Sequence, residues 1–243
     1  MTAVTSATFP ATEAAPRLRP SAWLRATLLA ALAATGVVLA FDLLVAAGTI
    51  DRAVALEDHH GASAVPELFS RGEQRGGLVI GLLLYGAGIA FLLAGAAVLA
   101  ARSWPVPART LWLALVGTAA WSIAVLPALA APPLPPGLEV DLGIGARQGL
   151  YVGVVATGAL LVTAAIALGR SVAQHWLRVT LVALALLLSA AAALLAFPEQ
   201  RVLGDLPDSV LRDFRLAVFF GQTLFWSTMG LAGYLALRQG DAS

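Results

Sequence analysis

The sequence contains no cysteine and no lysine, and charged residues make up only 12% of its 243 positions. Without cysteine the chain can form neither disulfides nor thiolate metal sites. A soluble domain of this length carries roughly twice that charge. All 15 basic residues are arginine, which we attribute to the codon bias of a GC-rich genome. These absences argue against an ordinary soluble domain.

Several catalytic and nucleotide-binding motifs are also missing. No Gly-x4-Gly-Lys-Ser/Thr phosphate loop occurs, so the chain could not power transport with ATP by itself. Neither a Gly-x-Ser-x-Gly elbow nor a His-Glu-x-x-His helix is present. No basic patch with interleaved aromatic residues suggests a nucleic-acid partner. We therefore expect no enzyme and no permanently bound cofactor, and an intramembrane enzyme is the weakest alternative.

Long apolar runs dominate what remains, since 59% of the residues are hydrophobic. About 20 helical residues cross the hydrocarbon core of a bilayer. These runs are too long and too uniformly apolar for the alternating strands of a barrel. The sequence therefore predicts an all-α integral membrane protein with about six transmembrane helices in the lipid bilayer. The predicted spans are residues 26–47, 78–101, 110–131, 149–169, 179–197 and 216–237.

The predicted domain organisation follows from these spans. The first run is too long for a cleaved signal peptide, whose apolar core has about 7–15 residues. Residues 1–22 are rich in Pro, Ser, Thr and Ala, which predicts a disordered cytoplasmic tail. Residues 23–238 form the polytopic membrane domain, and residues 239–243 form a second short cytoplasmic tail.

Charge is unequally divided between the predicted faces. With both termini in the cytoplasm, the cell (inner) membrane orientation leaves two arginines in each short inner loop, as the positive-inside rule favours. The outer face then has eleven acidic residues against seven arginines, a net charge of −4. These acids are Asp51, Glu57, Asp58, Glu67, Glu73, Glu139, Asp141, Glu199, Asp205, Asp208 and Asp213. A carboxylate-rich mouth concentrates cations, although acidic loops could simply keep the rim solvated.

The spans group into three hairpins with similar openings. Each returning helix carries Arg, five residues and then Gly: Arg75 with Gly81, Arg147 with Gly153, Arg215 with Gly221. This pattern predicts three parallel repeats around an axis along the membrane normal.

The polar residues around these openings suggest structural pairing. An arginine at a helix N-terminus opposes the macrodipole, so we expect acidic partners such as Glu73, Asp141 and Asp213. The full set assigned to structural pairing comprises Arg52, Glu67, Arg71, Glu73, Gln74, Arg75, Arg147 and Arg215. Snorkelling into water is the alternative for the arginines.

The first outer loop is the densest polar segment and the predicted site of metal capture. It contains Asp51, Glu57, His59 and His60. Imidazole and carboxylate together suit divalent Co, Ni, Zn or Mn. Adjacent histidines diverge on a helix and could converge only in a loop. A solvated loop with incidental histidines is the alternative.

Two further residues are candidates along a pathway through the membrane. Asp42 is the only charged residue inside a predicted span, and such residues are functional candidates by default. It lies toward the outer end and could instead reach the interface. Gln222 belongs to the most polar span and could offer a carbonyl oxygen to a cation. Interhelical hydrogen bonding is its alternative role.

Polar motifs occur in a fixed order from about residue 24 onward. The first outer loop carries Ile50-Asp51-Arg52-Ala53 with Glu57, then Ser70-Arg71 with Gln74 and Gly76. The middle loop carries Pro132-Pro133, Arg147 and Tyr151, and the end carries Pro207, Leu211, Phe214-Arg215, Gln222, Trp226 and Gly230. In this order and spacing the chain resembles the CbtA-type predicted cobalt transporter subunits. The chain departs from the family at Ala47-Gly48-Thr49, where members often carry Gly-Glu-Pro.

This resemblance implies the membrane subunit of a cobalt uptake system that feeds cobalamin synthesis. The transported divalent cation would be Co²⁺. The resemblance also implies a partner, a very small one-span membrane protein with a His-rich tail, and an oligomer is compatible with it. Two alternatives stay open, a non-transporting membrane scaffold or regulatory subunit, and a transporter of another solute.

Overall fold

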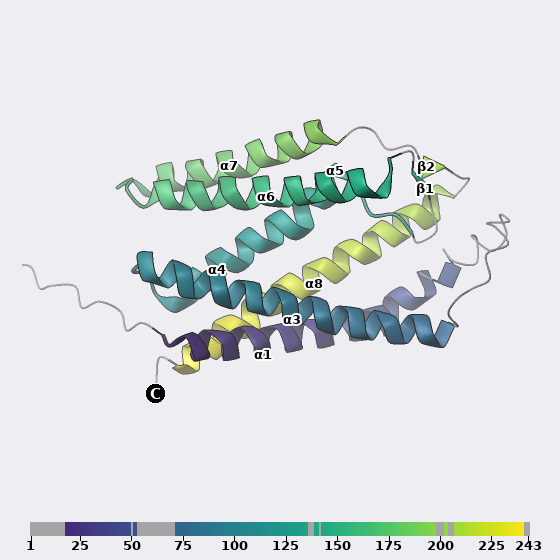
Figure 1. The fold of residues 1–243 in the computed structure, drawn as a ribbon, viewed down its shortest axis with the longest axis horizontal. Coiled ribbons are helices and arrows are strands. Elements are labelled where there is room, and N and C mark those ends of the chain that lie inside the picture. The colour runs from purple at the N-terminus through teal and green to yellow at the C-terminus, as the bar shows by residue number, and fades with distance from the viewer. Residues whose placement is uncertain are drawn as a thin grey trace, which may run out of the picture.

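The computed structural model describes residues 18–49, 51–52, 71–135, 139–140, 142–197, 202–203 and 207–240. The described residues form a bundle of long helices with one pair of very short strands (Figure 1). In chain order the elements are α1 (Pro20–Phe41), η1 (Asp42–Ala46), α3 (Arg71–Ser103), α4 (Ala108–Ala119), η2 (Ala120–Val125), α5 (Leu126–Ala130), β1 (Glu139–Val140), α6 (Ile144–Gly169), α7 (His175–Ala196), β2 (Val202–Leu203) and α8 (Asp208–Gly240).

Six helical segments in the described residues are long and apolar enough to cross a membrane, which confirms the predicted fold class. Large apolar side chains cover their outer surfaces, including Leu44 and Leu195, which are more than four-fifths exposed. In water that exposure would be unfavourable, whereas lipid tails are as apolar as leucine. The chain is therefore a multi-pass membrane protein.

Two of these helices are longer than their apolar runs. Helices α3 and α8 each have 33 residues, or about 50 Å of helix, against a hydrocarbon core of about 30 Å. Both begin well before the predicted spans, at Arg71 and Asp208. Polar residues occupy these first turns, so a hydropathy search excludes them although the backbone stays helical.

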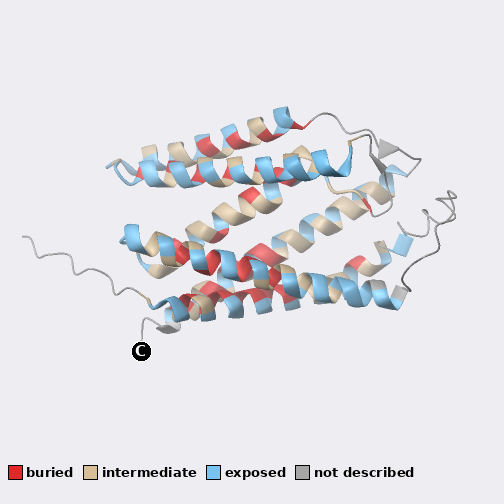
Figure 2. Ribbon diagram, in the orientation of Figure 1, coloured by how far each residue is buried: buried red, intermediate tan, exposed pale blue. Residues whose placement is uncertain are grey.

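The helices pack as two unequal clusters joined by the third span. Helix α1 packs against α3 and α8, and α4 packs against α8. The larger set of buried residues lies in this cluster, and a smaller set lies between α5, α6 and α7 (Figure 2). Helices α6 and α7 pack against each other, and η2 and α5 continue α4 into their cluster.

This packing differs from three equivalent hairpins around an axis. Helices α1 and α3 form a close pair as predicted, but among the described residues α7 and α8 do not. Helix α7 packs on α6 and α5, whereas α8 packs on α1 and α4. The three returning helices, α3, α6 and α8, share the Arg and Gly positions but do not have equivalent neighbouring helices. The threefold arrangement is therefore wrong for the third hairpin.

Close helix contacts form at glycines. A Cβ atom on Gly86 of α3 would collide with Thr35 of α1, and one on Gly233 of α8 would collide with the Trp112 ring of α4. Gly158 of α6 has the same relation to Leu126. Small residues let membrane helices approach closely, which strengthens dispersion contacts where no hydrophobic driving force acts between helices.

The two ends of the bundle differ in their connections. The short turns between α3 and α4 and between α6 and α7 lie at the end where α8 finishes (Figure 1). There the Arg170 guanidinium donates to the Ser103 carbonyl at 3.0 Å and lies over the Trp104 ring. At the opposite end β1 pairs antiparallel with β2. This strand pair was not predicted, because two-residue strands leave no periodic pattern.

Candidate functional site

The predicted outer rim is represented in the structure by the junction of the first two spans. Asp51 Oδ2 lies 3.5 Å from Arg75 Nη2, and both side chains are largely exposed. Arg52 Nε donates to the Gly48 carbonyl at 3.3 Å. Asp51, predicted as a metal ligand, is thus paired with Arg75. Exposed pairs of this kind contribute only about 0–1 kcal/mol.

The other predicted capture ligands cannot be placed. Glu57, His59 and His60 lie outside the described residues, as does Glu67. Arg71, Glu73 and Gln74 fall on the first turn of α3. Within the part of the chain that the structure describes, no three His, Cys, Asp or Glu residues gather in a way that could hold a metal ion.

Asp42 lies where α1 becomes π-helical, at the first residue of η1. Its half-buried side chain faces α8, because a methyl group at Gly221 would lie 4.0 Å from Asp42 Oδ1. Glycine leaves open the space that a larger side chain would fill next to this carboxylate. Single π-turns occur frequently at functional sites, so the backbone and the charge both mark this position.

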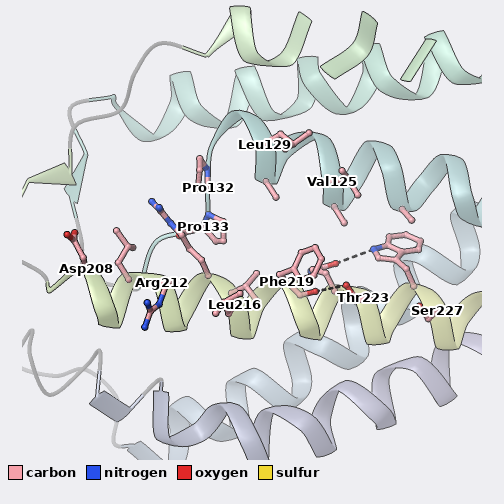
Figure 3. Close-up of a pocket in the computed structure, with 18 of the residues that line it drawn as sticks. Val125, Leu129, Pro132, Pro133, Asp208, Arg212, Leu216, Phe219, Thr223 and Ser227 are labelled. Atoms are coloured by element: carbon pink, nitrogen blue, oxygen red, sulfur yellow. Dashed lines mark hydrogen bonds between the residues drawn. The ribbon is translucent and has the colours of Figure 1, made fainter. Parts of the chain in front are cut away.

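Gln222 lines a groove of about 930 Å³ between α8 and the η2–α5 segment. Figure 3 shows Val125, Leu129, Pro132 and Pro133 on one wall, facing Leu216, Phe219 and Thr223 of α8. Gln222 Oε1 accepts a hydrogen bond from Trp226 Nε1 at 3.2 Å. Thr223 donates to the Phe219 carbonyl at 2.8 Å. The polar groups of this groove are therefore bonded largely within α8.

Asp42 and Gln222 do not face one cavity in the described residues. Asp42 is not among the residues that line the groove. It faces Gly221, and consecutive helical residues point about 100° apart. The two predicted pathway residues thus lie on different sides of α8.

Arg75 pairs with an acid, Asp51, but Arg147 and Arg215, which were also predicted to pair with acids, have other surroundings. Arg215 Nε donates to the Pro133 carbonyl at 3.4 Å, and Asp213 lies 3.6 Å from Arg212 instead. Side chains two positions apart on a helix do not face each other, so the Asp213 carboxylate points away from Arg215. Arg147 is half-buried on the first turn of α6. Among the described residues its side chain has no hydrogen bond or ion pair.

Tryptophan side chains contribute interior contacts that the sequence does not reveal. Trp23, Trp112 and Trp226 are buried in the larger cluster, and Trp112 Nε1 donates to the Gly230 carbonyl at 3.0 Å. Trp121 Nε1 donates to Ser189 Oγ of α7 at 3.0 Å. Interfacial preference alone would place tryptophans at the membrane surface.

Comparison with known proteins agrees with the resemblance seen in the motifs. The family described as probable cobalt transporter subunit (CbtA) matches residues 20–237, nearly the whole membrane domain. The matched region includes Asp42, Asp51, Gln222 and every described helix apart from the end of α8. No curated protein and no solved structure matches the chain significantly. The chain therefore belongs to the CbtA family of probable cobalt transporter subunits.

Proposed function

We propose that this membrane subunit admits Co²⁺ at the end of the bundle that holds the long connections and passes it inward. The observation that carries the proposal is the position of Asp42, a carboxylate within a span that faces Gly221 of the neighbouring helix. Ionisable groups inside membranes are rare and mark ion pathways. Co²⁺ accepts carboxylate and imidazole ligands.

Capture of the cation is assigned to Asp51, Glu57, His59 and His60. Asp51 is paired with Arg75. Because that pair is exposed and weak, an arriving dication can compete with Arg75 for the carboxylate. Arg75 would then occupy the Asp51 carboxylate and link the first two spans until the cation displaces it.

The inward path is assigned to Asp42, with Gln222 as a second candidate. The Gln222 carbonyl oxygen accepts from Trp226 but has a second lone pair that could face a cation. Because the two residues lie on different sides of α8, a route using both requires α8 to rotate or shift. A route that uses Asp42 alone requires no such movement of α8.

The family description as a subunit implies partner subunits in a transporter complex. We assign this role to a very small one-span membrane protein with a His-rich tail. We also place both termini in the cytoplasm and the chain in the inner membrane. Purification of the tagged chain from its native membrane should recover that small protein, and a stable complex without it would contradict the assignment.

The capture site is tested by the double substitution Asp51→Asn with Glu57→Gln. These changes remove two negative charges while preserving side-chain shape, so the protein should insert normally. Accumulation of radiolabelled cobalt should fall about tenfold, the change that corresponds to about 1.4 kcal/mol of cation binding. The assay uses cells that lack the chromosomal copy and retain the neighbouring genes.

The matched control is Glu13→Gln with Asp241→Asn, which removes the same charge from the predicted tails. This control should accumulate cobalt like the unmodified chain. Normal uptake in the Asp51–Glu57 double variant would refute the capture site. Normal uptake in cells that lack the chain altogether would favour a scaffold.

A further inference from the structure

The groove between α8 and η2–α5 shares Gln222 with the proposed cation path, but Asp42 and Asp51 do not line it. Its walls are almost entirely apolar, and its charged residues, Asp208, Arg212 and Arg215, all lie toward the outer end of α8. One end of the groove is thus polar and the rest is apolar. Figure 3 shows Arg212 at the polar end, with Leu216 and Phe219 further along α8. This polarity matches an amphiphile oriented with its headgroup toward the rim.

Arg215 is the arginine at this mouth that has no acidic partner in the part of the chain that the structure describes. Its half-buried guanidinium has one hydrogen bond in the described residues, from Nε to the neutral Pro133 carbonyl. Arg212 is close to Asp213, and Asp208 is exposed on the outermost turn of α8. A partly desolvated cation without a counter-charge is unfavourable, and the Nη groups of Arg215 suit a bidentate phosphate contact.

The groove has the size of a small-molecule site. Its volume is about 930 Å³, which lies in the range of about 300–1,000 Å³ typical of such sites. An extended acyl chain fits this space.

We propose that the groove is a specific site for an anionic phospholipid. The phosphate contacts Arg215, and one acyl chain lies along Leu129, Leu216 and Phe219 toward Trp226. The lipid would fill the gap between the two helix clusters and neutralise Arg215. This site does not depend on the proposed function, because lipid binding is measured without cobalt.

The test titrates lipid into the full-length, delipidated chain with any subunits that copurify, and native mass spectrometry counts bound lipid. The unmodified chain should bind dioleoylphosphatidylglycerol about tenfold more tightly than dioleoylphosphatidylcholine, a difference of about 1.4 kcal/mol. Arg215→Gln should abolish that preference, and Arg215→Lys should retain part of it. Arg238→Gln, at the exposed opposite end of α8, is the control and should bind like the unmodified chain.

A second substitution tests the apolar part of the groove and leaves every charged residue in place. Ala128 is an exposed lining residue of α5, so Ala128→Trp should fill the groove without disturbing the core, and lipid binding should fall. It also serves as the independent test if Arg215→Gln unfolds.

Four results would each overturn the proposal. The first is an equal affinity of the unmodified chain for the two lipids, and the second is undiminished binding in Ala128→Trp. The third is equally tight binding of glycerol 3-phosphate, which indicates an anion site without an acyl chain. The fourth is a photocrosslink from position 128 to another polypeptide, which indicates a protein occupant.

Discussion

Asp42 is the residue on which the proposed pathway depends most. An ionised carboxylate at mid-bilayer costs about 2.5–3.5 kcal/mol on insertion scales, less toward the interface. Here it faces Gly221, where a Cβ atom would lie in van der Waals contact with the Phe41 ring and the Asp42 carboxylate. An apolar residue would pack there at no electrostatic cost, so the proposed cation passage gives a reason for the carboxylate that packing does not.

Replacing Asp42 by Asn tests this argument. The amide preserves shape and removes the charge, so uptake of radiolabelled cobalt should fall about tenfold, equivalent to about 1.4 kcal/mol. The thermal midpoint in detergent should not decrease, because the buried charge itself is unfavourable. Thr118→Val, an isosteric change at a hydroxyl that bonds within its own helix, is the matched control. Uptake equal to that of the control would refute the role of Asp42.

Residue identities were easier to predict than residue partners. The sequence alone identified Asp42 as the single charge within a span, because hydropathy shows any such charge plainly. It could not show that Arg215 meets a backbone carbonyl or that Trp112 reaches the Gly230 carbonyl. Those contacts join positions 82 and 118 residues apart, and no local pattern encodes them.

The third span is the element that departs most from a regular helix. Pro127, in the first turn of α5, has no N–H to donate and its ring opposes the carbonyl four residues earlier. That carbonyl belongs to Ile123, and it accepts a hydrogen bond from the Tyr151 hydroxyl of α6 at 3.0 Å. The π-helical η2 ends at Val125, two residues before this proline. A freed carbonyl inside a membrane needs a donor, and α6 supplies it.

Removing that donor should loosen the contact between the third span and α6. Tyr151→Phe leaves the ring in place and leaves the Ile123 carbonyl unsatisfied, at a cost of about 1–3 kcal/mol. The thermal midpoint in detergent should therefore fall. Tyr85→Phe is the control, because among the described residues the Tyr85 hydroxyl has no hydrogen bond, and its midpoint should hold. Equal midpoints for the two variants would show that the Tyr151 bond contributes nothing.

At the scale of the whole molecule, two clusters of helices meet along the third span and α8. Membrane insertion was predictable, because six apolar runs leave only helices as a spanning solution. The partner of each helix was not, because apolar surfaces in lipid carry no pattern that distinguishes one neighbour from another. Contacts such as Gly233 with Trp112 select the neighbours instead, and they explain why α8 joins α1 and α4 rather than α7.

The orientation of the bundle is the claim that the transport account depends on most. The chain has no native cysteine, so single cysteines can be introduced at exposed serines without further changes. Ser209 lies at the end with the long connections, and Ser171 lies in the turn between α6 and α7.

A membrane-impermeant maleimide applied to intact cells makes the test direct. The account predicts labelling of Ser209→Cys in intact cells and labelling of Ser171→Cys only after permeabilisation. The reverse pattern would place the acid-bearing connections in the cytoplasm and contradict inward passage of cobalt from that end.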